Sequence, residues 1–201
     1  VWKKEAKFGF RHNAIAVGNE LVFCIDMVPD ELKPIVASNK NGQGTIYAIK
    51  LNSGELAWST EQGVFGTFLS YSAEHDILIQ SARASRDMLA NEPSNRINTY
   101  QGKDGKPIWD KSQGYSGPCL IVDKEILTQN VGFSLFDGSS KLRLDTITNE
   151  RVGWGFVRNY GCATAIGSKN LLTFRSGSAG YFDLTNDSGT GNFGGFRAGC
   201  S

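Results

Sequence analysis

The sequence of 201 residues predicts an all-β protein built from four copies of one structural unit. Two markers lead to this prediction. Tryptophan recurs after 56, 51 and 45 residues, at Trp2, Trp58, Trp109 and Trp154. A polar turn followed by an apolar strand recurs after 56, 49 and 45 residues, beginning at Gly18, Glu74, Asp123 and Ser168. Because the two markers drift in step along the chain, they indicate an internal repeat.

The clearest copies of the unit are residues 46–58 and 97–109, which read I-Y-A-I-K-L-N-S-G-E-L-A-W and I-N-T-Y-Q-G-K-D-G-K-P-I-W. In each copy an alternating strand leads into a polar turn that carries a glycine, Gly54 or Gly105. A short strand then ends in tryptophan. The pattern predicts a hairpin whose closing tryptophan is a large apolar plug between neighbouring units.

Each unit is expected to form four short strands. In the first unit they are residues 8–17, 20–26, 45–51 and 55–59, and in the second 67–72, 77–82, 96–101 and 107–110. The segments 27–44 and 83–95 are polar insertions, which we expect to be surface loops. The third unit offers strands at 120–122, 126–129 and 134–136, followed by a wider excursion over 139–150. The fourth offers 163–166, 171–175 and 180–184, with a weak last strand because glycines follow it.

Antiparallel four-stranded units that repeat every ~40 to 55 residues are typical of a β-propeller, in which each unit is one blade. We therefore predict one propeller segment over residues 1–201, with blades near 7–59, 65–111, 115–156 and 160–194. A β-sandwich is the alternative, but it does not require the same unit four times. Residues 1–2 and 195–201 resemble partial blades, so we expect contiguous further blades that complete a seven- or eight-bladed ring.

Composition narrows the possible partners. Twenty-one basic and twenty acidic residues leave a net charge of +1, which does not predict binding to nucleic acid. The sequence has no apolar run of the roughly 20 residues that a membrane-spanning helix needs.

The strand, turn and closing tryptophan of residues 47–58 resemble the repeat of pyrroloquinoline-quinone-like (PQQ-like) propellers. That repeat occurs in quinoprotein alcohol dehydrogenases, in an outer-membrane assembly lipoprotein and in large secreted proteins of planctomycete-type bacteria. Residues 10–16, 158–162 and 170–200 are most similar to the last group, whose activity is unassigned. The resemblance covers the whole chain and implies a periplasmic or extracellular bacterial protein.

The resemblance does not extend to the cofactor site. Quinoprotein dehydrogenases of this family carry two adjacent cysteines against the quinone, a calcium ion held by oxygen ligands and an aspartate base. None of Cys24, Cys119, Cys162 and Cys200 is adjacent to another, and no calcium loop stands out. We therefore predict no cofactor, no metal and no catalytic residue in these residues; PQQ and calcium are expected only if the chain is part of such a dehydrogenase.

Candidate ligand-binding residues expected near the central channel are three arginines, Arg11, Arg175 and Arg197, and one histidine, His12. Guanidinium groups there would hold a carboxylate or a phosphate by bidentate hydrogen bonds. The alternative is structural, because propeller arginines also tie blades together through carboxylates. His75, the second histidine, is expected in a hairpin turn.

Cys162 and Cys200 share a Gly-Cys-small context at equivalent places in successive blades. They would form a disulfide if their Cα atoms lay within about 7 Å. The alternative is that the four cysteines are buried thiols.

The strong fold pattern without a catalytic constellation favours a non-catalytic binding or scaffolding module of a larger extracytoplasmic protein. Its ligand would be a protein or a cell-surface molecule recognised through blade loops. The alternative is a segment of a PQQ- and calcium-dependent alcohol dehydrogenase. A third possibility is an appended domain that positions an enzyme elsewhere in the same chain.

Overall fold

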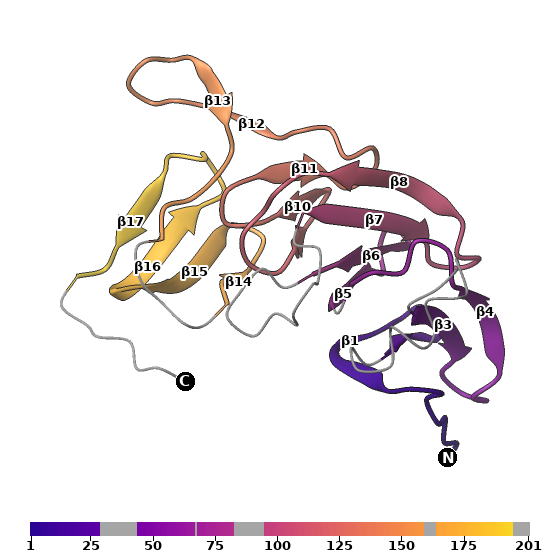
Figure 1. Cartoon of the computed structure of the whole chain (residues 1–201). Coiled ribbons are helices and arrows are strands. Elements are labelled where there is room, and N and C mark those ends of the chain that lie inside the picture. The colour runs from indigo at the N-terminus through magenta and orange to yellow at the C-terminus, as the bar shows by residue number, and fades with distance from the viewer. Residues whose placement is uncertain (29–43, 67, 83–94, 159–163, 195–201) are drawn as a thin grey trace. The chain divides into compact units, whose positions relative to one another are not determined.

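The computed structural model describes residues 1–28, 44–66, 68–82, 95–158 and 164–194 (Figure 1). These residues form strands β1 to β17 and contain no helix, which confirms the all-β prediction. No helix with the length and apolar composition of a membrane span is found in this part of the chain. The chain divides into two compact units, Val1–Gly114 and Tyr115–Ser201.

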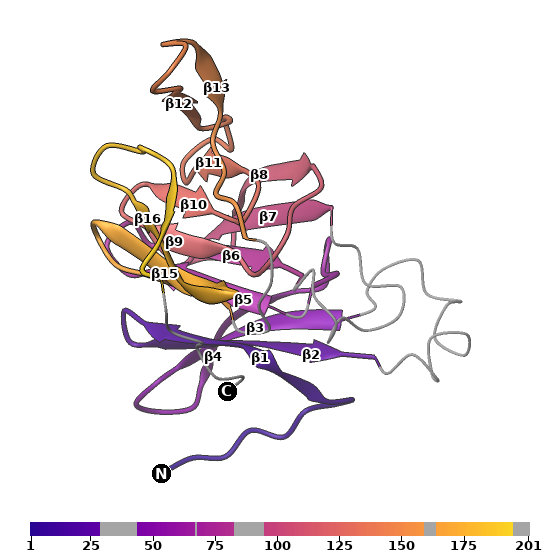
Figure 2. The same ribbon diagram turned by 90° about the vertical axis from the view of Figure 1, so that its left-hand side faces the viewer.

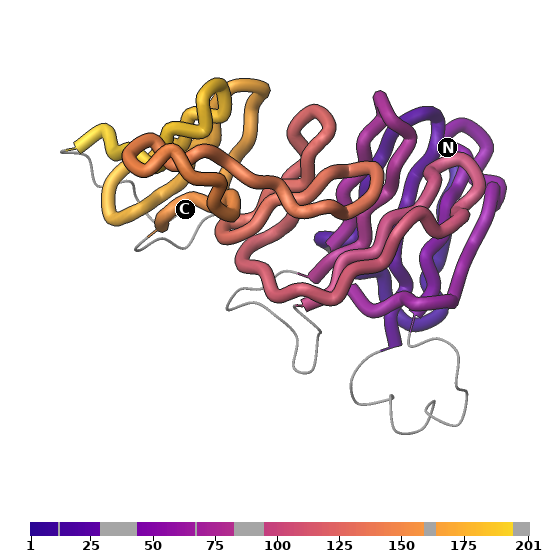
Figure 3. Tube along the Cα trace, turned by 90° about the horizontal axis from the view of Figure 1, so that it is seen from above, coloured from indigo at the N-terminus to yellow at the C-terminus, as the bar shows by residue number. Residues whose placement is uncertain are grey.

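The first unit contains two four-stranded antiparallel sheets, and in each the strands follow one another in sequence order (Figure 3). The first sheet comprises β1 (Phe10–Gly18), β2 (Leu21–Met27), β3 (Gly44–Lys50) and β4 (Leu56–Thr60). The second comprises β5 (Phe68–Ser72), β6 (Ile77–Ser81), β7 (Arg96–Gln101) and β8 (Pro107–Ser112). All eight strands lie within two residues of the predicted bounds.

Local backbone chemistry explains the tight β1–β2 turn. Asn19 and Glu20 both have positive φ angles, 46° and 61°. Two consecutive residues of this kind form a turn whose twist matches that of the flanking strands. The register is Gly18 opposite Leu21 and Val17 opposite Val22, so the hairpin closes directly on the turn.

Alternation along the strands builds one core within the first unit. Phe23 and Ile25 of β2 and Ile46 and Ala48 of β3 are fully buried, and they lie two residues apart on their strands. Such spacing places each pair on one face of the sheet. They pack in one cluster with apolar residues of the second sheet, namely Leu69, Leu78 and Tyr100.

Trp58 of the first sheet packs against a turn of the second. The indole nitrogen of Trp58 donates a hydrogen bond of 2.7 Å to the carbonyl of Gly102. Its ring lies over Gly105, where an added Cβ would stand 2.7 Å from the ring. Gly105 also has a φ of 72°, a conformation that L side chains rarely adopt. Glycine is therefore required at this turn for its backbone and for the closeness of the indole.

Trp2 meets the first sheet in the same way. Its indole nitrogen donates a hydrogen bond of 2.7 Å to the carbonyl of Leu51. Its ring lies over Gly54, which has a φ of 75° and where an added Cβ would stand 2.6 Å from the ring. Leu51 and Gly54 match Gly102 and Gly105 in the repeat. Trp2 therefore makes the same two contacts with the first sheet that Trp58 makes with the second.

The second unit is less regular. Its first sheet has three strands, β9 (Leu120–Val122), β10 (Glu125–Leu127) and β11 (Gly132–Ser134). Its other sheet has four, β14 (Ile166–Gly167), β15 (Leu171–Ser176), β16 (Ser178–Asp183) and the short β17 (Thr190–Asn192). The third strand of the first sheet begins two residues earlier than the predicted 134–136.

The segment predicted as a wider excursion, 139–150, is built into a hairpin. β12 (Leu142–Leu144) pairs only with β13 (Arg151–Gly153) in a two-stranded sheet. Both ribbon views show this hairpin standing away from the β9–β11 sheet (Figures 1 and 2). The third copy of the repeat thus lacks a fourth strand in its sheet, because the chain leaves the sheet after Lys141.

Trp154 centres the core of the second unit. It is 1% exposed and packs with Leu127, Leu172 and Phe182, and its ring centroid lies 5.3 Å from that of Phe182. Its indole nitrogen donates a hydrogen bond of 2.9 Å to the carboxylate of Asp187, where Trp2 and Trp58 use a backbone carbonyl. Trp109 lies in β8, where its backbone nitrogen and carbonyl both hydrogen-bond with the hydroxyl of Thr99.

We expect Trp58→Ala to lower the free energy of unfolding by about 3 kcal/mol, because it removes a large ring and leaves the Gly102 carbonyl without its donor. Urea denaturation of the two proteins measures the difference. Ile147→Ala, at a side chain that is 92% exposed, is the control and should change little.

Gly105→Ala should also destabilise more than Gly117→Ala, since both have positive φ but only Gly105 touches a ring. Equal losses for the two glycine variants would contradict the packing role of the indole.

Candidate functional site

The residues predicted to line a channel fall in separate parts of the chain. Arg11 and His12 lie in β1 of the first unit, and Arg175 lies in β15 of the second. The Nε atom of Arg11 is buried and has no hydrogen-bond partner among the described residues. The carbonyl of Arg175 accepts a 2.8 Å hydrogen bond from Nε of Arg158. Arg197 lies outside the described residues, so a shared anion site of these residues stays a prediction.

Two of the four cysteines, Cys24 and Cys119, lie in the described residues, and both are buried. Burial, reinforced by the nearby charge of Asp26, raises the pKa of Cys24 to about 11. Its thiol therefore stays protonated at neutral pH and is a poor nucleophile. The predicted Cys162–Cys200 disulfide lies outside the described residues and stays a prediction.

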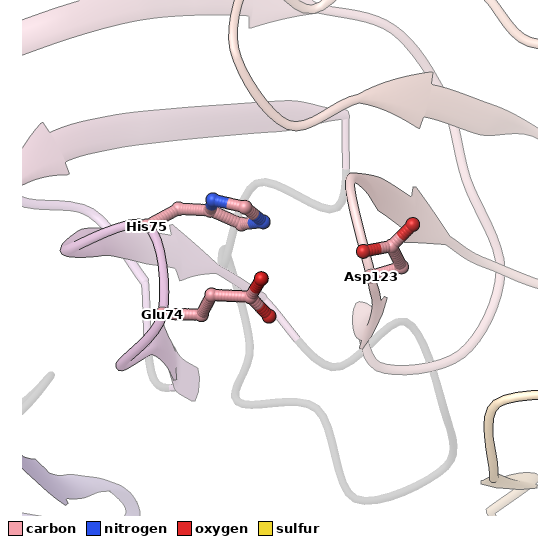
Figure 4. A group of neighbouring side chains, drawn as sticks. All are labelled: Glu74, His75 and Asp123. Carbon is pink, nitrogen blue, oxygen red and sulfur yellow. The ribbon is translucent and has the colours of Figure 1, made fainter.

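His75 occupies the turn between β5 and β6, as predicted, beside Glu74 (Figure 4). Its backbone nitrogen donates to the hydroxyl of Ser72 across 3.4 Å. Asp123, also drawn in Figure 4, occupies the β9–β10 turn of the second unit, the place that matches Glu74 in the repeat. These residues therefore belong to the turns that join the first two strands of their sheets.

Asp26 is a structural acid that the sequence analysis did not single out. It is 2% exposed, and its carboxylate accepts hydrogen bonds from the backbone nitrogens of Lys7 (2.6 Å), Phe8 (3.0 Å) and Gly9 (2.8 Å). These bonds hold the segment that enters β1 against the end of β2. The buried Asp26 carboxylate is satisfied by this segment, so it has a structural role.

The same task is done by other side chains in the next two sheets. Oε1 of Gln80 accepts from the backbone nitrogens of Phe65 and Gly66 at 2.8 and 3.2 Å. Oδ1 of Asn130 accepts from the nitrogen of Ser116 at 2.8 Å. Three different residue types accept these backbone hydrogen bonds, and they stand at positions that do not match in the repeat. The sequence repeat therefore could not predict them.

Asp26→Ala should lower the free energy of unfolding by about 2 to 4 kcal/mol, because three backbone N–H groups lose one buried acceptor. Urea denaturation measures the loss. Glu61→Ala, an exposed acid of the same unit, is the matched control. A loss for Asp26→Ala no larger than that of the control would show that water replaces the carboxylate without penalty.

Lys141 holds a partly buried ion network in the second unit. Its Nζ lies 2.7 Å from Oε1 of Glu125 and 3.0 Å from Oδ2 of Asp187, and its side chain is 16% exposed. The other Asp187 oxygen accepts the Trp154 indole, so one carboxylate joins the lysine to the core. Burial alone would lower the pKa of Lys141, but the hydrogen bonds and charges of Glu125 and Asp187 outweigh it and raise the pKa.

The raised pKa predicts a pH dependence of stability. The network stabilises the fold below the ordinary lysine pKa of 10.5 and is lost as pH rises through the higher folded-state value. Lys141→Met should be less stable than the native chain at pH 8, and the difference should shrink above about pH 10.5. Urea denaturation at pH 8, 10 and 11 tests this. Stability curves that stay parallel across this range would rule out a role for the Lys141 charge.

The β12–β13 hairpin presents apolar side chains to solvent. Leu142 and Leu144 are 50% and 55% exposed, and Ile147 at the turn is 92% exposed. The turn is held by Oδ1 of Asp145, which accepts from the nitrogens of Ile147 (2.9 Å) and Thr148 (3.0 Å). These backbone hydrogen bonds lower the pKa of Asp145, and the bond from Thr148 has a larger effect than the bond from Ile147. The carboxylate therefore stays ionised at neutral pH and keeps the turn closed.

Sequence reasoning placed this segment in an excursion but assigned it no role. A signal was present: L-R-L alternates apolar and charged residues, and the following Asp and Thr are typical of a side-chain-stabilised turn. We take the hairpin as the candidate functional site, because it combines exposed apolar side chains with a fixed backbone.

Comparisons with solved structures support the fold. BamB from Moraxella catarrhalis superposes with a TM-score of 0.57 at 13% identity, covering 92% of this chain and 53% of that one. The RRP9 WD40 repeats give 0.53 at 9% identity, with 92% and 51% covered. A europium-containing methanol dehydrogenase gives 0.51 at 7% identity, with 94% and 43% covered. No protein-family model and no curated protein sequence matches the chain.

These likenesses and the successive antiparallel sheets define a partial β-propeller protein. The propeller prediction is therefore confirmed. The chain spans about half the length of these structures, or less.

Proposed function

We propose that this chain is a binding or scaffolding module of a larger protein, and that the β12–β13 hairpin contacts its protein partner. The observation that carries the proposal is the exposure of Leu142, Leu144 and Ile147 on a turn fixed by Asp145. Burying apolar side chains that are already held in place avoids much of the entropy loss that weakens binding by flexible loops. The hairpin is thus suited to supply the apolar centre of an interface.

The polar groups of the molecule support a binding role in a second way. The buried Asp26 binds the segment that enters β1, and Lys141 is paired with two carboxylates, Glu125 and Asp187. Cys24 is held as a thiol by burial. Each of these groups serves the fold, whereas the hairpin's apolar side chains are left for a partner.

The setting of the module is part of the proposal. The resemblance of residues 47–58 to PQQ-like repeats supports a periplasmic or extracellular place, in a protein of the planctomycete-type group with further contiguous blades. The partner would be a protein or a cell-surface ligand, and the net charge of +1 gives no reason to expect nucleic acid.

The alternative proposal, a segment of a PQQ- and calcium-dependent alcohol dehydrogenase, rests on the same repeat. Quinone absorbance in the purified full-length protein, together with calcium-dependent turnover of an alcohol, would favour it over the binding module. The candidate ligand-binding residues to examine first would then be Arg11, His12, Arg175 and Arg197.

A photo-crosslinking amino acid at position 147 tests the binding module in the native host. We expect a discrete adduct of the full-length protein that is absent when the same amino acid replaces Ile166, a 69% exposed side chain of β14 in the same unit. The double substitution Leu142→Ser and Leu144→Ser should remove the adduct, since it deletes the apolar contact. Mass spectrometry of the adduct identifies the partner. Equal labelling from positions 147 and 166 would contradict the proposal.

A further inference from the structure

The hairpin also forms the side of a cavity. A cavity of about 370 Å³ is lined by residues of a single chain segment and its return strand, Ser140, Leu142, Arg143, Leu144 and Arg151. Leu142, Arg143, Leu144 and Arg151 come from the part of the third repeat that leaves its sheet, whereas Ser140 lies just before it and bridges to Phe133 of β11. None of the five is buried. The cavity is therefore open to a ligand from solvent.

The strand register explains how apolar and charged groups come together here. Leu142 and Leu144 are two residues apart on β12 and so project from the same face. Arg151 lies directly opposite Leu144 in the antiparallel pair, so it shares that face. A ligand on this face would meet two leucine side chains and a guanidinium group at once.

The two arginines that line the cavity have no partner in the described part of the chain. Neither the Arg143 nor the Arg151 side chain makes a hydrogen bond or an ion pair there, and the Nε atom of Arg143 is withdrawn from water without an acceptor. Lys141, close by in sequence, is by contrast paired with two carboxylates. Within the described residues, Lys141 is therefore paired with carboxylates, whereas Arg143 and Arg151 remain at the cavity without a carboxylate partner.

The acids of the hairpin do not neutralise these arginines. Asp145 and Glu150 lie at the turn and do not line the cavity. The carboxylate of Asp145 is occupied by the backbone nitrogens of Ile147 and Thr148, and Arg143 adds only the weakest contribution to its lowered pKa. The charge left at the cavity is positive, which complements a carboxylate.

The open edges of the hairpin indicate the form of the ligand. β12 and β13 pair only with each other, so each has one edge without a strand partner among the described residues. An extended peptide can add to such an edge through its backbone while alternate side chains enter neighbouring pockets. A small anion would use the arginines but not the leucines or the edge.

We propose that the β12–β13 cavity binds an extended protein segment in which carboxylate and apolar side chains alternate. The carboxylate pairs with Arg151 and is drawn by the charge of Arg143, and the apolar side chains cover Leu142 and Leu144. This rests on the proposed function, since it names the chemistry of the partner that the hairpin contacts.

Fluorescence anisotropy of the intact 201-residue chain with a labelled Leu-Glu-Leu-Glu-Leu peptide tests the proposal. We expect binding that weakens about tenfold or more for Arg151→Ala and also when glutamine replaces both glutamates in the peptide, because each change removes a charge-assisted hydrogen bond. Arg151 is exposed, so its replacement should leave the thermal unfolding midpoint unchanged. Lys169→Ala, an exposed cation elsewhere in the second unit, is the control and should bind like the native chain.

The outcomes separate the two proposals. Equal binding of the glutamate and glutamine peptides, or no effect of Arg151→Ala, overturns the acidic ligand. Absence of binding by both peptides, with the crosslink at position 147 retained, also overturns it while the binding module stands. Loss of the position-specific crosslink instead overturns the proposed function itself. Weaker binding in about 0.5 M salt, seen only with the glutamate peptide, supports the charge contact.

Discussion

The contact on which the first unit depends is a tryptophan ring laid over a turn glycine of the neighbouring sheet. Trp58 reaches Gly105 and Trp2 reaches Gly54, each with an indole hydrogen bond of 2.7 Å to a carbonyl three residues before the glycine. The contact satisfies the one polar atom of the indole while it buries the apolar ring. It also fixes which turn of one sheet meets which strand of another, since no side chain fits between ring and glycine.

Around this shared contact, the units vary in how they hold their connections. A carboxylate, an amide of glutamine and an amide of asparagine anchor the segments that enter successive sheets, at Asp26, Gln80 and Asn130. The physical demand is the same, because buried backbone nitrogens need acceptors. Any side-chain oxygen within reach meets it. In the second unit, Asp187 replaces a carbonyl as acceptor for Trp154 and so brings Lys141 and Glu125 into the same network. Variation is tolerated where only a hydrogen-bond acceptor is required, but not where a ring must lie on a backbone.

The third repeat departs from this pattern, and its side chains change surroundings as a result. Its sheet ends after three strands, and the hairpin β12–β13 takes the place of a regular fourth strand. Freed from the sheet, Leu142 and Leu144 keep the alternation of a strand but face solvent, and two arginines are left without carboxylate partners among the described residues. The regular first sheet also exposes apolar side chains, such as Val17 (57%) and Leu56 (52%), but those of the hairpin lie at a cavity together with two arginines. The candidate site lies there for that reason.

Local patterns along the chain were sufficient to predict the repeat, the all-β class and the eight strands of the first unit, because alternation, turn residues and tryptophan spacing are local signals with strong physical causes. They also placed Gly54 and Gly105 in equivalent turns. The partners of these residues depend on the tertiary structure alone: each glycine receives a ring, Asp26 holds the segment 7–9, and Lys141 finds Asp187. These pairings join residues that are distant along the chain and of no fixed type. The exposure of the hairpin leucines could not be predicted from the sequence either. Alternation indicates that the two faces of a strand differ, but not whether another element will cover the apolar face.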